Sequence, residues 1–360
     1  MSYTIIGASA AGLAAVKSIR SIDKTSQINI FSIEDLPITN KCFWADYALG
    51  LKTKEQIAWT TKEYLLSLDV NIIHEFVNNI DYTNKIISTS YNSYQFEKLI
   101  IACGLDPNKI KIDSKQIGNF KQVDDLVKDL SINNYKRVCV IGAGLSGLEF
   151  ADVCTKYAKE VLLIDRQNYP IYQQISPSAG AYIISKLKQN KINFIANSQE
   201  LPDADLYINA TGASPQKWLG PIADDNGYIK VDSCLKSGYK DIWAAGDCVL
   251  VPDQRTGLYV PSTLWPDAIR QGMLAGKSVA GEKVSYNGVL PICSSSFADV
   301  RFAAIAPTGQ DVENKIITTN EDYIEINCIN GKLSSYTLIG KCNQAAQFKR
   351  ALLTGENIFD

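Results

Sequence analysis

Residues 138–149 read Val-Cys-Val-Ile-Gly-Ala-Gly-Leu-Ser-Gly-Leu-Glu, and this stretch decides the fold. Its four apolar residues, rich in branched side chains, predict a buried parallel strand. The glycines fit the pattern G-x-G-x-x-G, and residues 148–157 predict a helix. Such glycines allow a tight turn, close approach of the backbone to a pyrophosphate, and close helix–strand packing. We therefore expect nucleotide phosphates at the N-terminus of this helix, where free N–H groups favour negative charge.

A carboxylate follows at the distance that a dinucleotide site requires. Asp165 lies 23 positions after Gly142, at the end of a strand predicted over residues 161–164. A carboxylate in this place can bind the ribose of an adenosine. The glycine pattern between two strands, together with this acid, predicts a dinucleotide-binding fold.

The N-terminus carries a second, imperfect copy of the same pattern. A strand predicted over residues 3–6 leads into Gly-Ala-Ser-Ala-Ala-Gly at residues 7–12, where Ser9 replaces the middle glycine. Serine is small enough to keep the backbone approach, although the fingerprint is weaker. Glu34 follows the next predicted strand, residues 28–33, and is the matching ribose carboxylate. Two dinucleotide folds in one chain imply two bound nucleotides.

Composition narrows the class of protein. A chain of 360 residues, 46% hydrophobic and 21% charged, is typical of a soluble protein with two or three domains. A net charge of -2 without a basic cluster argues against nucleic acid as a partner. No apolar run approaches the roughly 18 residues of a membrane span. Nine irregularly spaced cysteines and no signal peptide predict reduced thiols in the cytoplasm.

The remaining elements are predicted from their patterns. Residues 56–68 predict a helix, and residues 113–135 predict a connecting segment. An apolar strand before Gly246 delivers Asp247 to the carboxyl edge of a sheet, where ligands of open α/β sheets bind. From residue 286 the pattern is rich in strands, with a final helix over residues 343–353, and predicts a small third domain.

Five ordered motifs carry a resemblance to a known family. They are residues 7–12, Leu-Ile-Ile-Ala-Cys-Gly at 99–104, residues 142–149, Ile-Asn-Ala-Thr-Gly at 208–212, and Gly-Asp at 246–247. The chain resembles the FAD- and NAD(P)H-dependent pyridine nucleotide-disulfide oxidoreductases over nearly its whole length. Within them it is most similar to NADH:rubredoxin reductases and to the N-terminal half of assimilatory nitrite reductases. Motifs at 330–332, 338–340 and 355–358 are similar to the C-terminal domain of rubredoxin reductases.

The resemblance implies an α/β architecture with two Rossmann-like domains of the glutathione reductase type. An FAD-binding domain of residues 1–121 and 224–286 is then interrupted by an NAD(P)H-binding domain of residues 122–223. A small α+β domain of residues 287–360 follows. Only residues 197–204 separate two strands where the family usually inserts a meander, so we expect a trimmed NAD domain.

The resemblance also implies which residues bind the two cofactors. The positions implied for FAD are Gly7, Ser9, Ala10, Ala11, Gly12, Glu34, Lys41, Val77, Ala102, Gly104, Gly246 and Asp247. The positions implied for NAD are Gly142, Gly144, Ser146, Gly147, Glu149, Asp165, Arg166 and Gly212. Asp165 favours NADH, while the neighbouring Arg166 leaves NADPH open.

Cys42, next to Lys41, has two interpretations. A thiol beside a lysine and near a helix start has a stabilised thiolate, which facing the flavin could attack a disulfide or a peroxide. Alternatively, Cys42 is a small residue packed under the isoalloxazine ring while Lys41 contacts the flavin nucleotide. Cys103 is expected in the core, whereas Cys248 could approach the flavin beside Asp247.

These observations predict an enzyme that passes hydride from NADH to FAD and electrons to a small redox protein of rubredoxin type. One alternative is a reductase of disulfides, persulfides or peroxides, or an NADH oxidase, that uses Cys42. Another is a flavoprotein without turnover that senses redox state, akin to apoptosis-inducing factor. The sequence leaves the acceptor open, as it does the choice between monomer and homodimer; no metal is expected.

Overall fold

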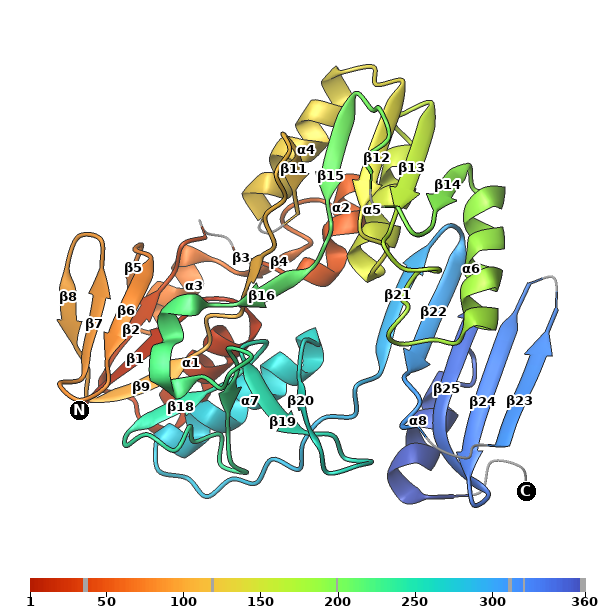
Figure 1. Cartoon of the computed structure of the whole chain (residues 1–360). Coiled ribbons are helices and arrows are strands. Elements are labelled where there is room, and N and C mark those ends of the chain that lie inside the picture. The colour runs from red at the N-terminus through yellow and green to blue at the C-terminus, as the bar shows by residue number, and fades with distance from the viewer. Residues whose placement is uncertain (35–37, 118–119, 199, 310–312, 320, 357–360) are drawn as a thin grey trace. The chain divides into compact units, whose positions relative to one another are not determined.

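The computed structural model describes residues 1–34, 38–117, 120–198, 200–309, 313–319 and 321–356. The chain forms two compact units (Figure 1). Unit 1 consists of Met1–Asp106 and Ala213–Val289, and unit 2 consists of Pro107–Gly212 and Leu290–Asp360. Each unit is therefore built from two separate segments of the chain.

Unit 1 is organised around a parallel sheet of five strands in the order β18-β9-β1-β2-β5. Its central strand pairs Ile5 with Ile30 on one side and with Ile100 on the other. All three isoleucines are buried, as expected for a parallel sheet covered on both faces. The strands are β1 (Ser2–Ile6), β2 (Gln27–Phe31), β5 (Val70–Ile73), β9 (Lys98–Ile101) and β18 (Ile242–Ala244).

Two helices of unit 1, α1 (Ala10–Ile22) and α7 (Trp265–Val279), pack backbone to backbone. A Cβ atom on Gly272 would lie 2.0 Å from the carbonyl oxygen of Ala11, closer than atoms can approach. One turn later, a Cβ on Gly276 would lie 2.5 Å from the carbonyl oxygen of Ala15. Glycines on α7 thus allow the contact that fixes the glycine-rich turn before α1.

The helix predicted over residues 56–68 is wrong. The structure has a strand, β4 (Ala58–Thr60), and a helix α3 that begins only at Lys62 (Lys62–Ser67). Thr61 ends the extended segment, because its hydroxyl accepts a hydrogen bond from the N–H of Tyr64 at 3.2 Å and caps the helix. Branched and aromatic residues before this cap favour the strand.

Unit 1 contains further short elements, of which β10 ends one residue into unit 2. They are β3 (Ile38–Thr39), η1 (Lys41–Phe43), α2 (Trp44–Ala48), β6 (Val77–Asp81), β7 (Ile86–Thr89), β8 (Ser93–Gln95), β10 (Leu105–Pro107), β16 (Ala213–Pro215), η2 (Lys217–Ile222), β17 (Ile229–Lys230), β19 (Val249–Pro252) and β20 (Tyr259–Pro261).

Unit 2 contains a second parallel sheet, in the order β11-β15-β12-β13-β14. The prediction of a plain connecting segment over residues 113–135 is wrong, because this segment forms β11 and the helix α4. Val123, Leu126 and Leu130 recur at helical spacing and are buried. The elements are β11 (Lys115–Gln116), α4 (Phe120–Ile132), β12 (Arg137–Ile141), α5 (Leu145–Thr155), β13 (Glu160–Ile164), α6 (Pro177–Gln189), β14 (Ile192–Ile195) and β15 (Leu206–Asn209).

Unit 2 also holds an antiparallel sheet in the order β21-β22-β25-β24-β23, covered by the helix α8 (Ala345–Thr354). A hairpin turn at Asn330 and Gly331 joins β24 to β25, and both residues have positive φ, as a type I′ turn requires. The strands are β21 (Cys293–Phe297), β22 (Val300–Ile305), β23 (Glu313–Thr318), β24 (Tyr323–Ile329) and β25 (Lys332–Gly340). Residues 357–358 of the C-terminal motif lie outside the described residues.

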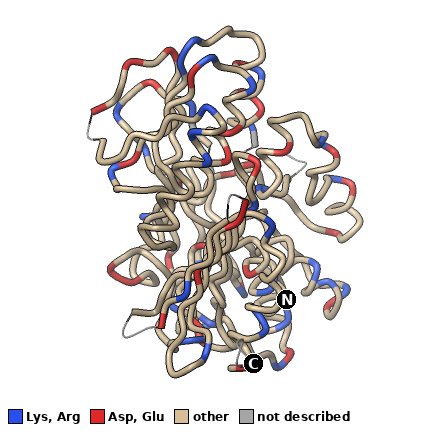
Figure 2. The backbone as a smooth tube through the Cα atoms, turned by 90° about the vertical axis from the view of Figure 1, so that its right-hand side faces the viewer, with Lys and Arg blue, Asp and Glu red and all other residues tan. Residues whose placement is uncertain are grey.

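Charged residues of both signs are interspersed along the chain (Figure 2). Among the helices in the described part of the chain, none combines the length and the apolar character needed to cross a membrane.

Gln271, on α7, connects three segments of unit 1. Its fully buried side chain accepts a hydrogen bond from the N–H of Gly246 at 2.7 Å. It also donates to the hydroxyls of Ser262, at 2.8 Å, and Tyr286, at 3.0 Å. The turn before Asp247 is therefore fixed by an amide side chain from a distant helix.

We expect Gln271→Leu to lower the free energy of unfolding by about 2–4 kcal/mol, because a buried N–H and two hydroxyls lose their partner. Denaturation followed by circular dichroism measures the loss. Met273→Leu on the same helix is the control, since this side chain is 45% exposed and a change of less than about 0.5 kcal/mol is expected. Equal losses in the two variants would contradict the role of the amide.

Candidate functional site

The turn between β1 and α1 fits a nucleotide phosphate. Gly7 has a φ of 105°, and its N–H donates to the carbonyl of Phe31 at 2.9 Å. A Cβ on Gly7 would lie 2.1 Å from the oxygen of Ala102, and a Cβ on Gly12 would lie 1.8 Å from the oxygen of Gly7. No side chain is tolerated at either position, so helix, turn and strand must stay in direct contact.

The N-terminus of α1 presents donors rather than side chains. Ser9 is the N-cap, and its hydroxyl makes no capping bond in the structure. The first helical bond runs from the N–H of Leu13 to the carbonyl of Ser9, and no acidic residue lies in the first turn. The N–H groups at Ala10, Ala11 and Gly12 precede this bond and are suited to phosphate oxygens.

Three charged residues of unit 1 come together beyond this turn. The ammonium group of Lys41 lies 3.1 Å from a carboxylate oxygen of Glu34 and 5.4 Å from the ring centroid of Trp44. Lys41 also acts electrostatically on Asp247, which follows β18. The structure thus brings together two carboxylates and one lysine, although Glu34 and Asp247 lie more than 200 residues apart in the sequence.

Asp247 binds its proton more tightly than an ordinary aspartate. Burial raises the pKa of Asp247 to about 6, although the positive charge of Lys41 acts in the opposite direction. The preceding Gly246 has a φ of 86°, and Gln271 holds its N–H. A partly buried carboxylate on a fixed turn can accept hydrogen bonds from the hydroxyls of a polyol chain.

The other positions implied for FAD also lie in unit 1. Val77 is buried at the start of β6, and Ala102 follows β9, where its N–H donates to Ile6 at 2.8 Å. Gly104 has a φ of 65°, with open space where a side chain would be. All twelve positions implied for FAD therefore belong to one compact unit.

Cys42 is exposed in the single turn η1. Its N–H donates to the side chain of Asn40 at 3.0 Å, which caps the turn. The neighbouring Lys41 is engaged with Glu34. The thiol is accessible, while the nearby positive charge is shared with a carboxylate.

Unit 2 repeats the geometry of the first turn. The N–H of Gly142 donates to Ile164 at 2.9 Å, and a Cβ on Gly142 would lie 2.4 Å from the oxygen of Ala210. A Cβ on Gly147 would lie 1.8 Å from the oxygen of Gly142, the same value as in unit 1. At Gly144 nothing lies within 4 Å of an added Cβ. This open position corresponds to Ser9 in the first turn, so the serine there is sterically tolerated.

The carboxylate of Asp165 is fixed at the edge of this second turn. One oxygen accepts from the N–H of Ala143 at 2.6 Å, and the other accepts from Gln167 at 2.8 Å. Arg166, the next residue in the chain, and Ser146 on α5 are exposed. Sequence reasoning missed these two backbone bonds, which orient the acid before any ribose binds.

Two further features of unit 2 were missed. Glu149 on α5 accepts a short hydrogen bond from the hydroxyl of Ser295 on β21, so the antiparallel sheet orients this acid. At the end of β15, the side chain of Asn209 accepts from the N–H of Thr211 at 3.2 Å and donates to the carbonyl of Asn108 at 2.5 Å. The N–H of Asn108 in turn donates to Gly212 at 3.0 Å. The roles of these hydroxyl and amide side chains follow no sequence motif, so one sequence does not predict them.

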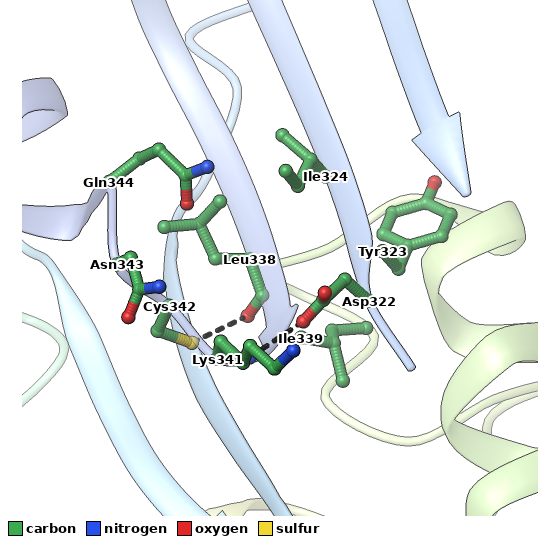
Figure 3. Close-up of a pocket in the computed structure, with 9 residues that line it drawn as sticks. All are labelled: Asp322, Tyr323, Ile324, Leu338, Ile339, Lys341, Cys342, Asn343 and Gln344. Atoms are coloured by element: carbon green, nitrogen blue, oxygen red, sulfur yellow. Dashed lines mark hydrogen bonds between the residues drawn. The ribbon is translucent and has the colours of Figure 1, made fainter. Parts of the chain in front are cut away.

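Two hollows lie away from these turns. One of about 60 Å³ lies in the antiparallel sheet of unit 2, where the thiol of Cys342 donates to Leu338 and the N–H of Lys341 donates to Asp322 (Figure 3). Another, of about 680 Å³, lies at the start of β18, next to Asp241 and Ile242. Asp247 follows the other end of that strand.

Comparison with known proteins finds a matching family and similar proteins. The sequence pattern of the family described as "Pyridine nucleotide-disulphide oxidoreductase" matches residues 1–200 of the 360. The NADH-rubredoxin oxidoreductase of Clostridium acetobutylicum is 27% identical, and the match covers 97% of this chain and 93% of that protein. An NADH oxidase of Methanocaldococcus jannaschii is also 27% identical, covering 86% of this chain and 76% of its own length.

Solved structures show the same fold. The water-forming NADH oxidase from Lactobacillus brevis, determined with NADH bound, superimposes with a TM-score of 0.90 at 20% identity. The superposition covers 100% of this chain and 92% of the other. At this identity the likeness concerns the fold alone, and it confirms the predicted α/β class with Rossmann-like sheets.

The two glycines of the second turn should respond differently to substitution. Gly147→Ala places a methyl group against a backbone carbonyl, so we expect a loss of about 3 kcal/mol or more in the free energy of unfolding. Gly144→Ser enters open space at a φ of -72° and copies the first turn. For this control we expect a change below about 1 kcal/mol and NADH binding weakened by less than about tenfold. Similar destabilisation in both variants would refute the steric argument.

Asp247 should make the stability of the flavin-free protein depend on pH. Its pKa of about 6 exceeds the ordinary value of 3.8, so the folded state binds this proton more tightly than the unfolded state. Stability is therefore lost as pH rises from 4 to 6, by at most about 3 kcal/mol. Asp247→Asn should be more stable than the wild type by an amount that grows over this range and then stays constant. Parallel curves for the two proteins, from denaturation at each pH, would contradict it.

Proposed function

Because the chain belongs to the pyridine nucleotide-disulphide oxidoreductase family and is thus an FAD-dependent NAD(P)H oxidoreductase, we propose that it passes hydride from NADH to FAD and electrons to a small redox protein of rubredoxin type. The observation that carries the proposal is the repeated turn. Each unit holds one strand–turn–helix junction that rejects side chains at two glycines, and a carboxylate follows the next strand in both. Two such junctions serve two dinucleotides.

In this proposal unit 1 holds FAD. The turn at Gly7 and Gly12 and the N–H groups of α1 take the pyrophosphate, Glu34 takes the adenosine ribose, and Asp247 takes the ribityl chain. Bound FAD supplies the group that accepts a hydride and releases electrons singly or in pairs. Lys41 balances the charge of Glu34 and Asp247, which would otherwise repel the pyrophosphate.

Unit 2 then holds NADH. Asp165 supports this choice over NADPH, because its two oxygens are already fixed by backbone N–H groups beside the turn. A fixed carboxylate accepts hydrogen bonds from ribose hydroxyls and repels a 2′-phosphate. Glu149, oriented by Ser295, is proposed to lie near the nicotinamide ribose. The protein's part is to orient the two rings and to exclude water between them.

The similarity to an NADH-rubredoxin oxidoreductase supports the proposed acceptor. The match covers 97% of this chain, so it includes the antiparallel sheet with α8 as well as the two nucleotide folds. A rubredoxin-type acceptor takes single electrons and needs no thiol on the enzyme. In this case Cys42 is a small residue beside the flavin.

A second candidate rests on the exposure of Cys42. Its place in a capped turn beside Lys41 would allow a thiolate to attack a disulfide, persulfide or peroxide. A relative named NADH oxidase, also 27% identical, is compatible with this reading. The two candidates differ in whether the sulfur is needed for turnover.

Anaerobic titration with NADH tests the proposal. We expect one equivalent of NADH to bleach the bound flavin, and oxidised rubredoxin to restore its colour within the time of turnover. Cys42→Ser should leave both steps within about twofold of the wild type. Loss of acceptor turnover in this variant, with a long-wavelength thiolate–flavin band in the wild type alone, would instead establish the second candidate. A flavin that NADH does not bleach would contradict both.

A further inference from the structure

Two cysteines outside the proposed nucleotide contacts meet in unit 1. Cys103 lies two residues beyond the end of β9, and Cys248 lies four residues beyond the end of β18. These strands are neighbours, with Ala244 paired to Ile101. The segments that follow these two strands therefore leave the sheet at the same edge and bring their thiols to the same place.

The contacts of the sulfur atoms confirm this placement. The Sγ atom of Cys248 lies 3.6 Å from the carbonyl oxygen of Ile101, at the end of the neighbouring strand. The Sγ atom of Cys103 lies 3.7 Å from the carbonyl oxygen of Gly104 and interacts with the Cys248 thiol. Cys248 is fully buried, whereas Cys103 is partly exposed. Of the two residues, Cys103 is therefore the one that a small reagent reaches first.

We propose that Cys103 and Cys248 are a redox modification site that closes to a disulfide when the protein meets a hydroperoxide. The Cys103 thiolate attacks the outer oxygen of the peroxide, giving a sulfenic acid and an alcohol or water. The Cys248 sulfur then attacks this sulfenic sulfur, forms the S–S bond and expels water. Two thiols lose two electrons and two protons, and the peroxide takes up both. The two interacting sulfur atoms must close to about 2.05 Å, the length of an S–S bond.

The environment sets the rate of this reaction. The Cys248 thiol beside it and burial raise the pKa of Cys103 well above its ordinary value. The thiolate is the reactive form, so the pair is slow at neutral pH, and its rate should rise about tenfold for each pH unit. Sustained peroxide, rather than a brief exposure, is the condition to which the pair responds.

Closure would also restrain the proposed FAD site, an effect that rests on the proposed function. Cys103 precedes Gly104, and Cys248 follows Asp247, two positions proposed to contact FAD. A covalent link between these segments prevents either from moving alone. We therefore expect FAD to leave the oxidised protein at least about twofold more slowly than the reduced protein.

The test uses the FAD-loaded Cys42→Ser protein, which lacks the exposed thiol of η1. After hydrogen peroxide treatment, alkylation under denaturing conditions and peptide mapping should find a Cys103–Cys248 peptide that is 2 Da lighter than the dithiol. Dithiothreitol should restore both thiols. Adding Cys103→Ser should abolish the bond and leave Cys248 free. Adding Cys154→Ser, a buried cysteine of unit 2, is the control and should leave the bond unchanged.

Recovery of Cys103 and Cys248 as free thiols, or in bonds to other cysteines, would overturn the proposal. Because the map needs neither NADH nor an acceptor, it is independent of the proposed reaction. FAD release from the oxidised and reduced forms is then followed by fluorescence. An unchanged rate in protein that carries the bond would overturn the coupling to the cofactor site.

Discussion

The structure depends on one steric constraint that occurs twice. In both units the helix after the glycine turn lies so close to the turn that a single Cβ would stand 1.8 Å from a backbone oxygen. This contact fixes the direction of the helix axis relative to the strand. The first N–H groups of the helix consequently point past the carboxyl edge of the sheet, where phosphate can bind without a basic side chain.

The same constraint explains which parts of the sequence pattern are essential. Gly7 and Gly12 in unit 1, and Gly142 and Gly147 in unit 2, are required by contacts within the protein. The middle position, Ser9 or Gly144, is an N-cap in both units, and at Gly144 it faces open space. Ser9, which makes the first motif imperfect, therefore stands at the position of the motif where the fold leaves space for a side chain.

Residues with a local pattern could be predicted from the sequence, and residues that act over long distances could not. The strands and glycine turns were predictable because apolar runs and glycines signal their own structure. The strand β4 was missed because Trp59 and Thr60 have apolar neighbours at spacings that also fit a helix. Gln271 was missed as a support for Gly246, since the two lie 25 residues apart and their bond exists only after α7 packs on α1.

Electrostatics in unit 1 follows from the same arrangement. A turn that offers only N–H groups attracts phosphate but gives no charge to balance the carboxylates that bind sugars. The ammonium group of Lys41 lies 3.1 Å from a carboxylate oxygen of Glu34. Lys41 acts on Asp247 more weakly than burial does, so burial determines the direction of the pKa shift of Asp247. An acid buried in this way disfavours its own ionisation until hydroxyl donors surround it. We expect the proposed cofactor to supply those donors. Cofactor binding and folding stability are then coupled through the Asp247 carboxylate.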